Sequence, residues 1–198
     1  MNRDENRIPL EMQDAEVVLY PDFFATKEAD VLFSALSETI AWRQDPIRIY
    51  GRVVDQPRLT AWYGNAGRSY TYSGIKMDPL PWTPVLLQIR RRIEAVAGVA
   101  FNSVLLNQYR NERDSVSWHS DDEPELGVNP VIASVSFGAT RRFQFKHKHD
   151  PHLRATVDLT HGSLLVMAGP TQHYWKHQIP KSTRPHGSRI NLTFRVIR

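Results

Sequence analysis

The pattern of apolar and polar positions changes character near Gly98. Before this point, two segments repeat apolar side chains every three or four residues, which is the periodicity of an amphipathic helix. The first predicts a helix over residues 26–40 with Thr26 as its N-cap, on the apolar positions Ala29, Leu32, Phe33, Leu36 and Ile40. The second predicts a helix that starts at Thr83, has Pro84 at its first helical position and ends before Gly98.

After Gly98 the chain consists of short β-like runs separated by turn residues. The runs cover residues 103–110, 131–137, 141–147, 153–159, 162–168, 173–178 and 188–197. Many short strands at this spacing indicate a double-sheet barrel or jelly roll with helices packed outside it. We therefore expect a mostly β protein with flanking helices, α+β overall, formed by residues 1–198 as one domain. Within it we expect a loose arm over 1–15, hairpins and loops over 42–82, and the jelly-roll core over 99–198.

The last run alternates strictly between polar and apolar residues. Its polar members fall on one face of the expected strand, and they are Arg189, Asn191, Thr193 and Arg195. Asn107 and Tyr109 share a face in the run 103–110 in the same way. Each pattern is also typical of an edge strand with one solvent-exposed face. If the polar faces of both strands turn inward instead, they line a ligand cavity.

Composition narrows the chemistry that such a cavity can hold. The 198 residues include no cysteine, so a metal site must use nitrogen and oxygen ligands. No apolar run approaches the length of a membrane span, and the first residues are too polar for a signal-peptide core. The net charge of +4 favours a polyanionic partner only weakly, because many small enzymes are equally basic.

A candidate metal site begins with His119-x-Asp121. Residues two apart in an extended segment point the same way, so one imidazole and one carboxylate can bind a single ion. His177 is the best candidate for the third ligand of a two-histidine, one-carboxylate triad, which leaves open coordination positions for an oxoacid and dioxygen. His173 is a rival for this place, whereas the cluster His147, His149 and His152 lies in a charged turn region where we expect solvent exposure. An arginine on the last strand can bind the carboxylate of an oxoacid.

From residue 45 onward the chain resembles the AlkB family of Fe(II)/2-oxoglutarate-dependent dioxygenases. The resemblance rests on Asn107-x-Tyr109, His119-x-Asp121-x-Glu123, His177, and the ending Arg189-x-Asn191-Leu192-Thr193-Phe194-Arg195. It continues upstream through Tyr70-Thr71-Tyr72-Ser73-Gly74 and Pro81-Trp82. Two further stretches, Ile49-Tyr50-Gly51 and residues 134–139, are similar to the branch that repairs duplex DNA.

The resemblance implies a role for each matching residue. Iron(II) would be bound by His119, Asp121 and His177. Arg195, helped by Tyr109, would hold the distal carboxylate of 2-oxoglutarate. Arg189, Asn107 and Asn191 would support its other end near the metal, and Thr193 is a further cofactor-binding candidate.

For the substrate, the resemblance implies a flipped base in DNA held by aromatic rings, as an extruded base requires. Tyr70 and Tyr72 match the family's base-lid residues within a nucleotide-recognition lid over 42–82, and Glu123 matches an acidic residue that reads the base edge. Tyr50 stands at the tip of a hairpin that would enter the base stack. The surrounding arginines, Arg43, Arg48, Arg52 and Arg58, could contact phosphates.

The function expected from this resemblance is oxidative demethylation of bases such as 1-methyladenine and 3-methylcytosine in DNA, coupled to decarboxylation of 2-oxoglutarate and using dioxygen. The alternative is an Fe(II)/2-oxoglutarate hydroxylase or demethylase that acts on RNA or protein. We expect a monomer without a membrane partner, working in the cytoplasm of a bacterium, at its nucleoid, or in the nucleus of a eukaryote.

Overall fold

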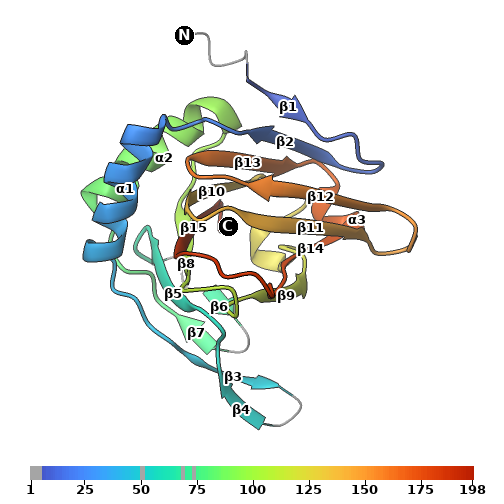
Figure 1. Ribbon diagram of the computed structural model, residues 1–198. Coiled ribbons are helices and arrows are strands. Elements are labelled where there is room, and N and C mark those ends of the chain that lie inside the picture. Colours follow the sequence, from blue (N-terminus) through green and yellow to red (C-terminus); the bar gives the residue numbers. More distant parts are fainter. Residues whose placement is uncertain (1–5, 50–51, 68–69, 73–74) are drawn as a thin grey trace.

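The computed structural model describes residues 6–198 except 50–51, 68–69 and 73–74. Its core is two antiparallel sheets that lie face to face (Figure 1). The major sheet has seven strands in the order β1 (Ile8–Pro9), β2 (Glu16–Tyr20), β13 (Ser163–Ala168), β10 (Ile132–Gly138), β15 (Arg189–Arg195), β8 (Ser103–Tyr109) and β5 (Leu59–Gly64). The minor sheet has four, in the order β12 (Arg154–Leu159), β11 (Arg141–His147), β14 (Trp175–Ile179) and β9 (Val116–His119). The expected jelly-roll core is thus confirmed.

Two helices cover the outer face of the major sheet, on one side of the molecule (Figure 1). Helix α1 (Thr26–Thr39) has its N-cap one residue earlier than predicted, because Ala25 takes this position in place of Thr26 and makes no side-chain capping bond. Helix α2 (Pro84–Ala97) follows the prediction: the Thr83 side chain accepts a hydrogen bond from the Leu86 amide, and Gly98 ends the helix at φ 69°.

Strand β15 divides its residues between two environments. Ile190, Leu192 and Phe194 point toward α1 and α2 and belong to the apolar core on that side. The four polar residues between and beside them point the other way, into the space between the two sheets. The alternation therefore marks an inward-facing polar surface and not an edge strand, since β15 lies between β10 and β8.

The N-terminal segment is held more firmly than the predicted loose arm. Strand β1 pairs with β2, and the Leu10 amide donates to the Val17 carbonyl at 2.9 Å. The Trp175 indole donates to the Gln13 carbonyl at 2.8 Å. Ile8 and Pro9 therefore extend the major sheet, and residues 1–5 lie outside the described part of the chain.

The segment 42–82 contains two hairpins and one strand of the major sheet. The hairpin of β3 (Pro46–Ile49) and β4 (Arg52–Asp55) projects from the body of the molecule (Figure 1). The second pairs β6 (Tyr70–Tyr72) with β7 (Ile75–Met77). Strand β5 lies between them in the chain and pairs with β8.

One predicted strand, 173–178, is shorter than expected. The short helix α3 (Thr171–Tyr174) occupies its first positions, because the His173 and Tyr174 amides both donate to the Pro170 carbonyl. A 3-10 turn, η1 (Pro124–Leu126), follows β9. None of the helices in the described residues is long and apolar enough to cross a membrane.

Candidate metal and ligand site

A cavity between the two sheets collects the residues that the sequence singled out. All three expected metal ligands, all six expected cofactor residues and Glu123 line it. These residues come from β8, β9, β14 and β15 and from the turn after β9. The lining also includes polar residues to which the sequence analysis gave no role in the cavity, Arg58 and Ser134, and an apolar group made of Leu105, Val116, Phe143, Met167 and Ile179.

His119, Asp121 and His177 form a cluster in the lining of this cavity. His119 and His177 are paired across β9 and β14, and Asp121 follows β9 by two residues. One ligand atom from each lies within 4.8 Å of the others, which is close enough to share one ion. Two imidazoles and a carboxylate without any thiolate are a donor set that suits iron(II).

The local contacts of His119 select its ligand atom. Its Nδ1 lies 2.8 Å from the Ser117 carbonyl oxygen. A carbonyl can only accept, so Nδ1 carries the proton and Nε2 keeps its lone pair for a metal. A hydrogen bond of this kind also fixes the plane of the ring.

Asp121 is almost fully buried and is held from two sides. Its backbone amide donates to Gln172 Oε1 at 2.9 Å, and its Oδ1 forms an ion pair with Arg195. Burial alone raises the pKa of Asp121, but the charges of Arg195 and His177 outweigh it and lower the pKa to about 2. The carboxylate is therefore ionised, as a metal ligand must be.

His177 lies between the metal cluster and the apolar wall. Its ring stacks on Phe143 with centroids 5.1 Å apart, and its Nε2 is 3.6 Å from Asp121 Oδ2. Burial and the neighbouring His119 lower the pKa of His177 to about 3, although Asp121 acts in the opposite direction. The imidazole is neutral at ordinary pH and can coordinate an ion.

Arg189 forms the other end of the cavity. It is 1% exposed, its Nη2 donates to Ser136 Oγ at 2.9 Å, and its guanidinium lies 5.1 Å from the Tyr109 ring centre. Its Nε and Nη1 are buried without a hydrogen-bond partner among the described residues. Burial lowers the pKa of Arg189 to about 10, so the group is still a cation. A buried cation with two free donors is suited to an anionic ligand, and a carboxylate matches its planar fork.

The partnership expected between Arg195 and Tyr109 is wrong. The register of β8 and β15 places Tyr109 opposite Arg189, whereas Arg195 lies opposite Ser103, about 20 Å further along the strands. Arg195 instead contacts Asp121 at the metal end. The two arginines thus serve opposite ends of one cavity.

The polar residues between these ends are locked by their neighbours. Asn191 donates to Ser134 Oγ at 2.8 Å and accepts from Thr193 at 3.1 Å. Asn107 accepts from the buried Arg58 at 2.7 Å. The alternation rule that marked β15 also applies to Ser134-Val135-Ser136, and it could have identified both inward-facing serines.

Arg58 corrects a second expectation, because it was taken as a phosphate contact. It is 5% exposed, lines the cavity, and donates to Asn107 and to the Ser115 carbonyl. A further buried arginine, Arg141, holds two loops together. It donates to the carbonyls of Asn111, Asp114 and Pro180 at 3.2, 3.0 and 2.7 Å.

The rival histidines lie away from the metal cluster. His173 is exposed on α3. His149 and His152 are exposed as expected, but His147 is buried, and its Nδ1 accepts hydrogen bonds from the amides of His149 and Asp150.

Only part of the expected base-recognition set can be placed. Glu123 lines the cavity, and its Oε2 is buried without a hydrogen-bond partner in the described part of the chain. The neighbouring Asp122 is engaged with Lys148 at 2.9 Å. Tyr70 and Tyr72 belong to β6 by their backbone, while their side chains and Tyr50 lie outside the described residues.

Comparison with known proteins agrees with this geometry. A protein-family model described as the 2OG-Fe(II) oxygenase superfamily matches residues 16–195. Alpha-ketoglutarate-dependent dioxygenase alkB homolog 3 of Homo sapiens is 47% identical over 192 residues, which cover 92% of this chain and 66% of that protein. DNA oxidative demethylase ALKBH2 of Mus musculus is 42% identical over 188 residues, covering 90% and 79%. The chain thus spans slightly less than two thirds of the length of the human alkB homolog 3.

Solved structures show the same fold at low sequence identity. The structure of OsALKBH1 superposes with a TM-score of 0.63 at 17% identity and covers 95% of this chain and 100% of that one. A crystal structure of an oxidoreductase of the 2OG-Fe(II) oxygenase family from Burkholderia pseudomallei gives a TM-score of 0.58 at 12% identity, covering 90% and 84%.

Proposed function

The chain belongs to the 2OG-Fe(II) oxygenase superfamily as an AlkB homologue, and on this premise we propose that it removes alkyl groups oxidatively from N-alkylated bases in DNA. The observation that carries the proposal is one cavity with a His119, Asp121 and His177 cluster at one end and the buried Arg189 cation at the other. A ligand that bridges these ends needs a metal-binding group and a distant carboxylate. 2-Oxoglutarate has both.

His119, Asp121 and His177 would hold the iron(II). When bound together with 2-oxoglutarate and dioxygen, the iron supplies the oxidation that hydroxylates an N-alkyl carbon, while 2-oxoglutarate loses carbon dioxide. The chain's own part is to orient the reactants and to keep water away from them. The buried apolar wall of Phe143, Met167 and Ile179 supports this role.

The contacts favour an orientation of 2-oxoglutarate opposite to that expected from the motifs. Arg189, stacked on Tyr109, would bind the distal carboxylate through its two free donors. Arg195 would steady Asp121 and the carboxylate end beside the metal. Asn107, Asn191 and Thr193 would line the path between the two ends.

Glu123 supports an alkylated base as the substrate. A ring such as 1-methyladenine or 3-methylcytosine carries positive charge, and Glu123 Oε2 is a buried acceptor with no donor among the described residues. Lys148 neutralises Asp122, so Glu123 is the carboxylate available to the base. Tyr70 and Tyr72 on the β6–β7 hairpin, and Tyr50, which follows β3 in the chain, would complete the lid over the base.

We further propose that residues 1–198 act as one catalytic domain and as a monomer. It would work where nucleic acid is found, in the cytoplasm of a bacterium or the nucleus of a eukaryote.

Mass spectrometry of a methylated DNA oligonucleotide after incubation with protein, iron(II), ascorbate and 2-oxoglutarate tests the proposal. We expect loss of the methyl mass with one succinate formed per methyl group removed. His119→Ala should abolish both, and His173→Ala, which changes an exposed histidine, should leave both intact. Succinate formation without any loss of methyl mass would exclude DNA demethylation, and a methylated RNA of the same sequence shows whether RNA is the substrate.

A further inference from the structure

The outer face of the minor sheet carries an unusual row of basic residues. Lys146 is paired directly with Arg154 on β12 and with Lys176 on β14, so the three side chains stand side by side on one face. Phe145 and His177, one position along, point inward, which places the basic row on the outside. Arg154 and Lys176 are exposed, and Lys146 is partly exposed.

This arrangement costs stability, because like charges directly opposite each other on a sheet repel. Among the described residues, no carboxylate forms an ion pair with Lys146, Arg154 or Lys176. The single carboxylate at the outward positions of β11, β12 and β14, all of them described, is Asp158, which pairs with Arg142 at 3.7 Å. An uncompensated row of this kind is explained if an anion binds across it.

An aromatic ring extends the row toward the cavity edge. The Lys146 ammonium lies 4.5 Å from the ring centre of Trp118, so its side chain crosses β14 to reach β9. Trp118 directly precedes the proposed iron ligand His119, whose ring points to the inner side. Cations combined with an aromatic ring are the combination that binds a nucleic-acid strand through its phosphates and bases.

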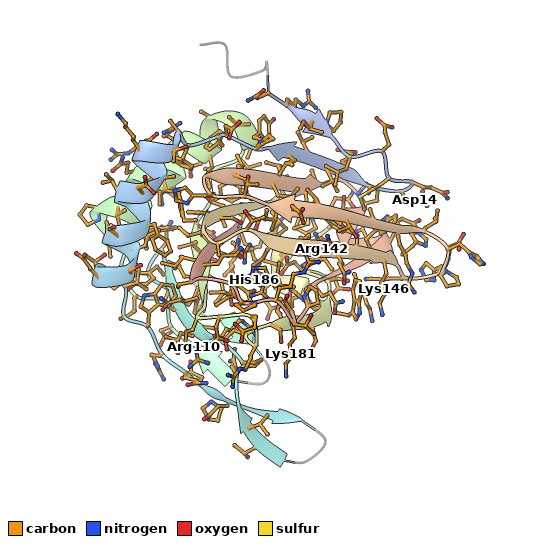
Figure 2. The ribbon with its side chains drawn as sticks, in the orientation of Figure 1. Asp14, Arg110, Arg142, Lys146, Lys181 and His186 are labelled. Carbon is orange, nitrogen blue, oxygen red and sulfur yellow. The ribbon has the colours of Figure 1, made fainter. Side chains whose placement is uncertain are left out.

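Further basic groups continue from this row toward the β3–β4 hairpin. Figure 2 shows Lys146 and Arg142 along β11, with Lys181, His186 and Arg110 between the minor sheet and that hairpin. Lys181 is exposed in the connection between β14 and β15. Arg142 and Arg110 are already paired with Asp158 and Asp114, so Lys181 is the cation that continues the basic surface toward the hairpin side of the molecule.

We propose that the row Arg154–Lys146–Lys176, with Trp118, is a docking surface for the phosphodiester backbone of a nucleic-acid strand beyond the nucleotide in the cavity. The inference rests on the proposed function for the identity of the strand. It adds a second contact area that is separate from the cavity and from the two hairpins. Its contribution is electrostatic and independent of base sequence.

The test is the triple variant Lys146→Gln, Arg154→Gln and Lys176→Gln. Binding of an unmodified single-stranded oligonucleotide, measured by fluorescence anisotropy at several salt concentrations, should weaken by about tenfold. The slope of log affinity against log salt should become shallower by about 2, because roughly three phosphate contacts are lost. The Michaelis constant for a long methylated oligonucleotide should rise, while turnover of a methylated trinucleotide should stay unchanged.

A matched control removes the same charge elsewhere, through Arg7→Gln, Lys27→Gln and Arg91→Gln, three residues that are exposed away from the minor sheet. This variant should bind and turn over like the unaltered protein. If both triple variants bind the oligonucleotide equally weakly, the loss comes from net charge alone and the proposal is wrong. Unchanged binding by the variant of Lys146, Arg154 and Lys176 would also overturn it. Fluorescence anisotropy measures binding without turnover, so the two proposals can fail separately. If the demethylation assay fails but the binding data are as expected, the proposed function is wrong and the docking surface is still supported.

Discussion

Arg195 forms an ion pair with Asp121 inside the cavity, at the end where the two histidines converge. The charge of this arginine is thus already engaged by a carboxylate of the protein. Arg189, six residues earlier on the same strand, lies in a cavity end without such a carboxylate among its described contacts.

Arg189→Gln should raise the 2-oxoglutarate concentration needed for half-maximal turnover by roughly two orders of magnitude, because a buried charge that binds the distal carboxylate is lost. The melting temperature without ligand should not fall, since two of the guanidinium nitrogens have no partner to lose within the described chain. Stabilisation by added 2-oxoglutarate should disappear. Arg142→Gln, on the exposed face of β11, is the control. An unchanged dependence on 2-oxoglutarate would contradict the assignment.

Gln172→Leu should weaken metal binding by about 10- to 100-fold without preventing folding. Gln172 is 1% exposed and accepts the hydrogen bond of the Asp121 amide, which holds the backbone beside a metal ligand. Calorimetric titration with manganese(II) measures the effect without turnover. Gln178→Leu changes an outward-facing glutamine on the next strand and should leave the affinity unaltered; equal affinities in all three proteins would show that Gln172 does not position Asp121.

The sequence predicts those features of this fold that depend on local periodicity. The polar face of β15 and the cap and end of α2 are decided by residues close to each other in the chain, and all were predicted. The convergence of His119-x-Asp121 with His177 was also predicted, because extended geometry fixes the first pair and the open positions of a triad require a third ligand.

What the sequence did not predict depends on register between distant strands. Tyr109 and Arg195 each point into the cavity, but only the pairing of β8 with β15 shows that they lie at opposite ends. Arg58 was judged by the arginines near it in the chain, yet its partners, Asn107 and Ser115, are 49 and 57 residues away. Contacts of that span are properties of packing, and no local pattern reports them.

Arg141→Met should lower the free energy of unfolding by roughly 3 kcal/mol, since three carbonyls in two loops lose their donor. Urea denaturation measures this change. The adjacent Arg142→Met is a close control, because Arg142 is exposed and its substitution should change stability by less than about 0.5 kcal/mol. Similar losses of unfolding free energy in both variants would show that the hydrogen bonds from Arg141 to the loops are not what stabilises the protein.

Asp114 should give the protein a stability that depends on pH. It is 4% exposed and accepts hydrogen bonds from the Arg110 amide and guanidinium. Burial alone raises the pKa of this carboxyl, but the bonds and charge of Arg110 outweigh it, so the pKa lies below its ordinary value. A lowered pKa in the folded state means that the ion pair contributes fully above the unfolded pKa, about 4, and that the contribution is lost as pH falls through the folded value.

Asp114→Asn should therefore cost about 2 kcal/mol of unfolding free energy at neutral pH. The gap in unfolding free energy between the variant and the unaltered protein should narrow as the pH falls below about 4. The unfolded chain of the unaltered protein then takes up a proton at this carboxyl, while the folded protein still keeps it ionised. Urea denaturation across a pH series measures the gap. Asp158→Asn, which changes an exposed carboxylate paired with Arg142, should show almost no gap at any pH. A gap for Asp114→Asn that stays constant down to acidic pH would show that the shape of the side chain stabilises the loop and that its charge does not.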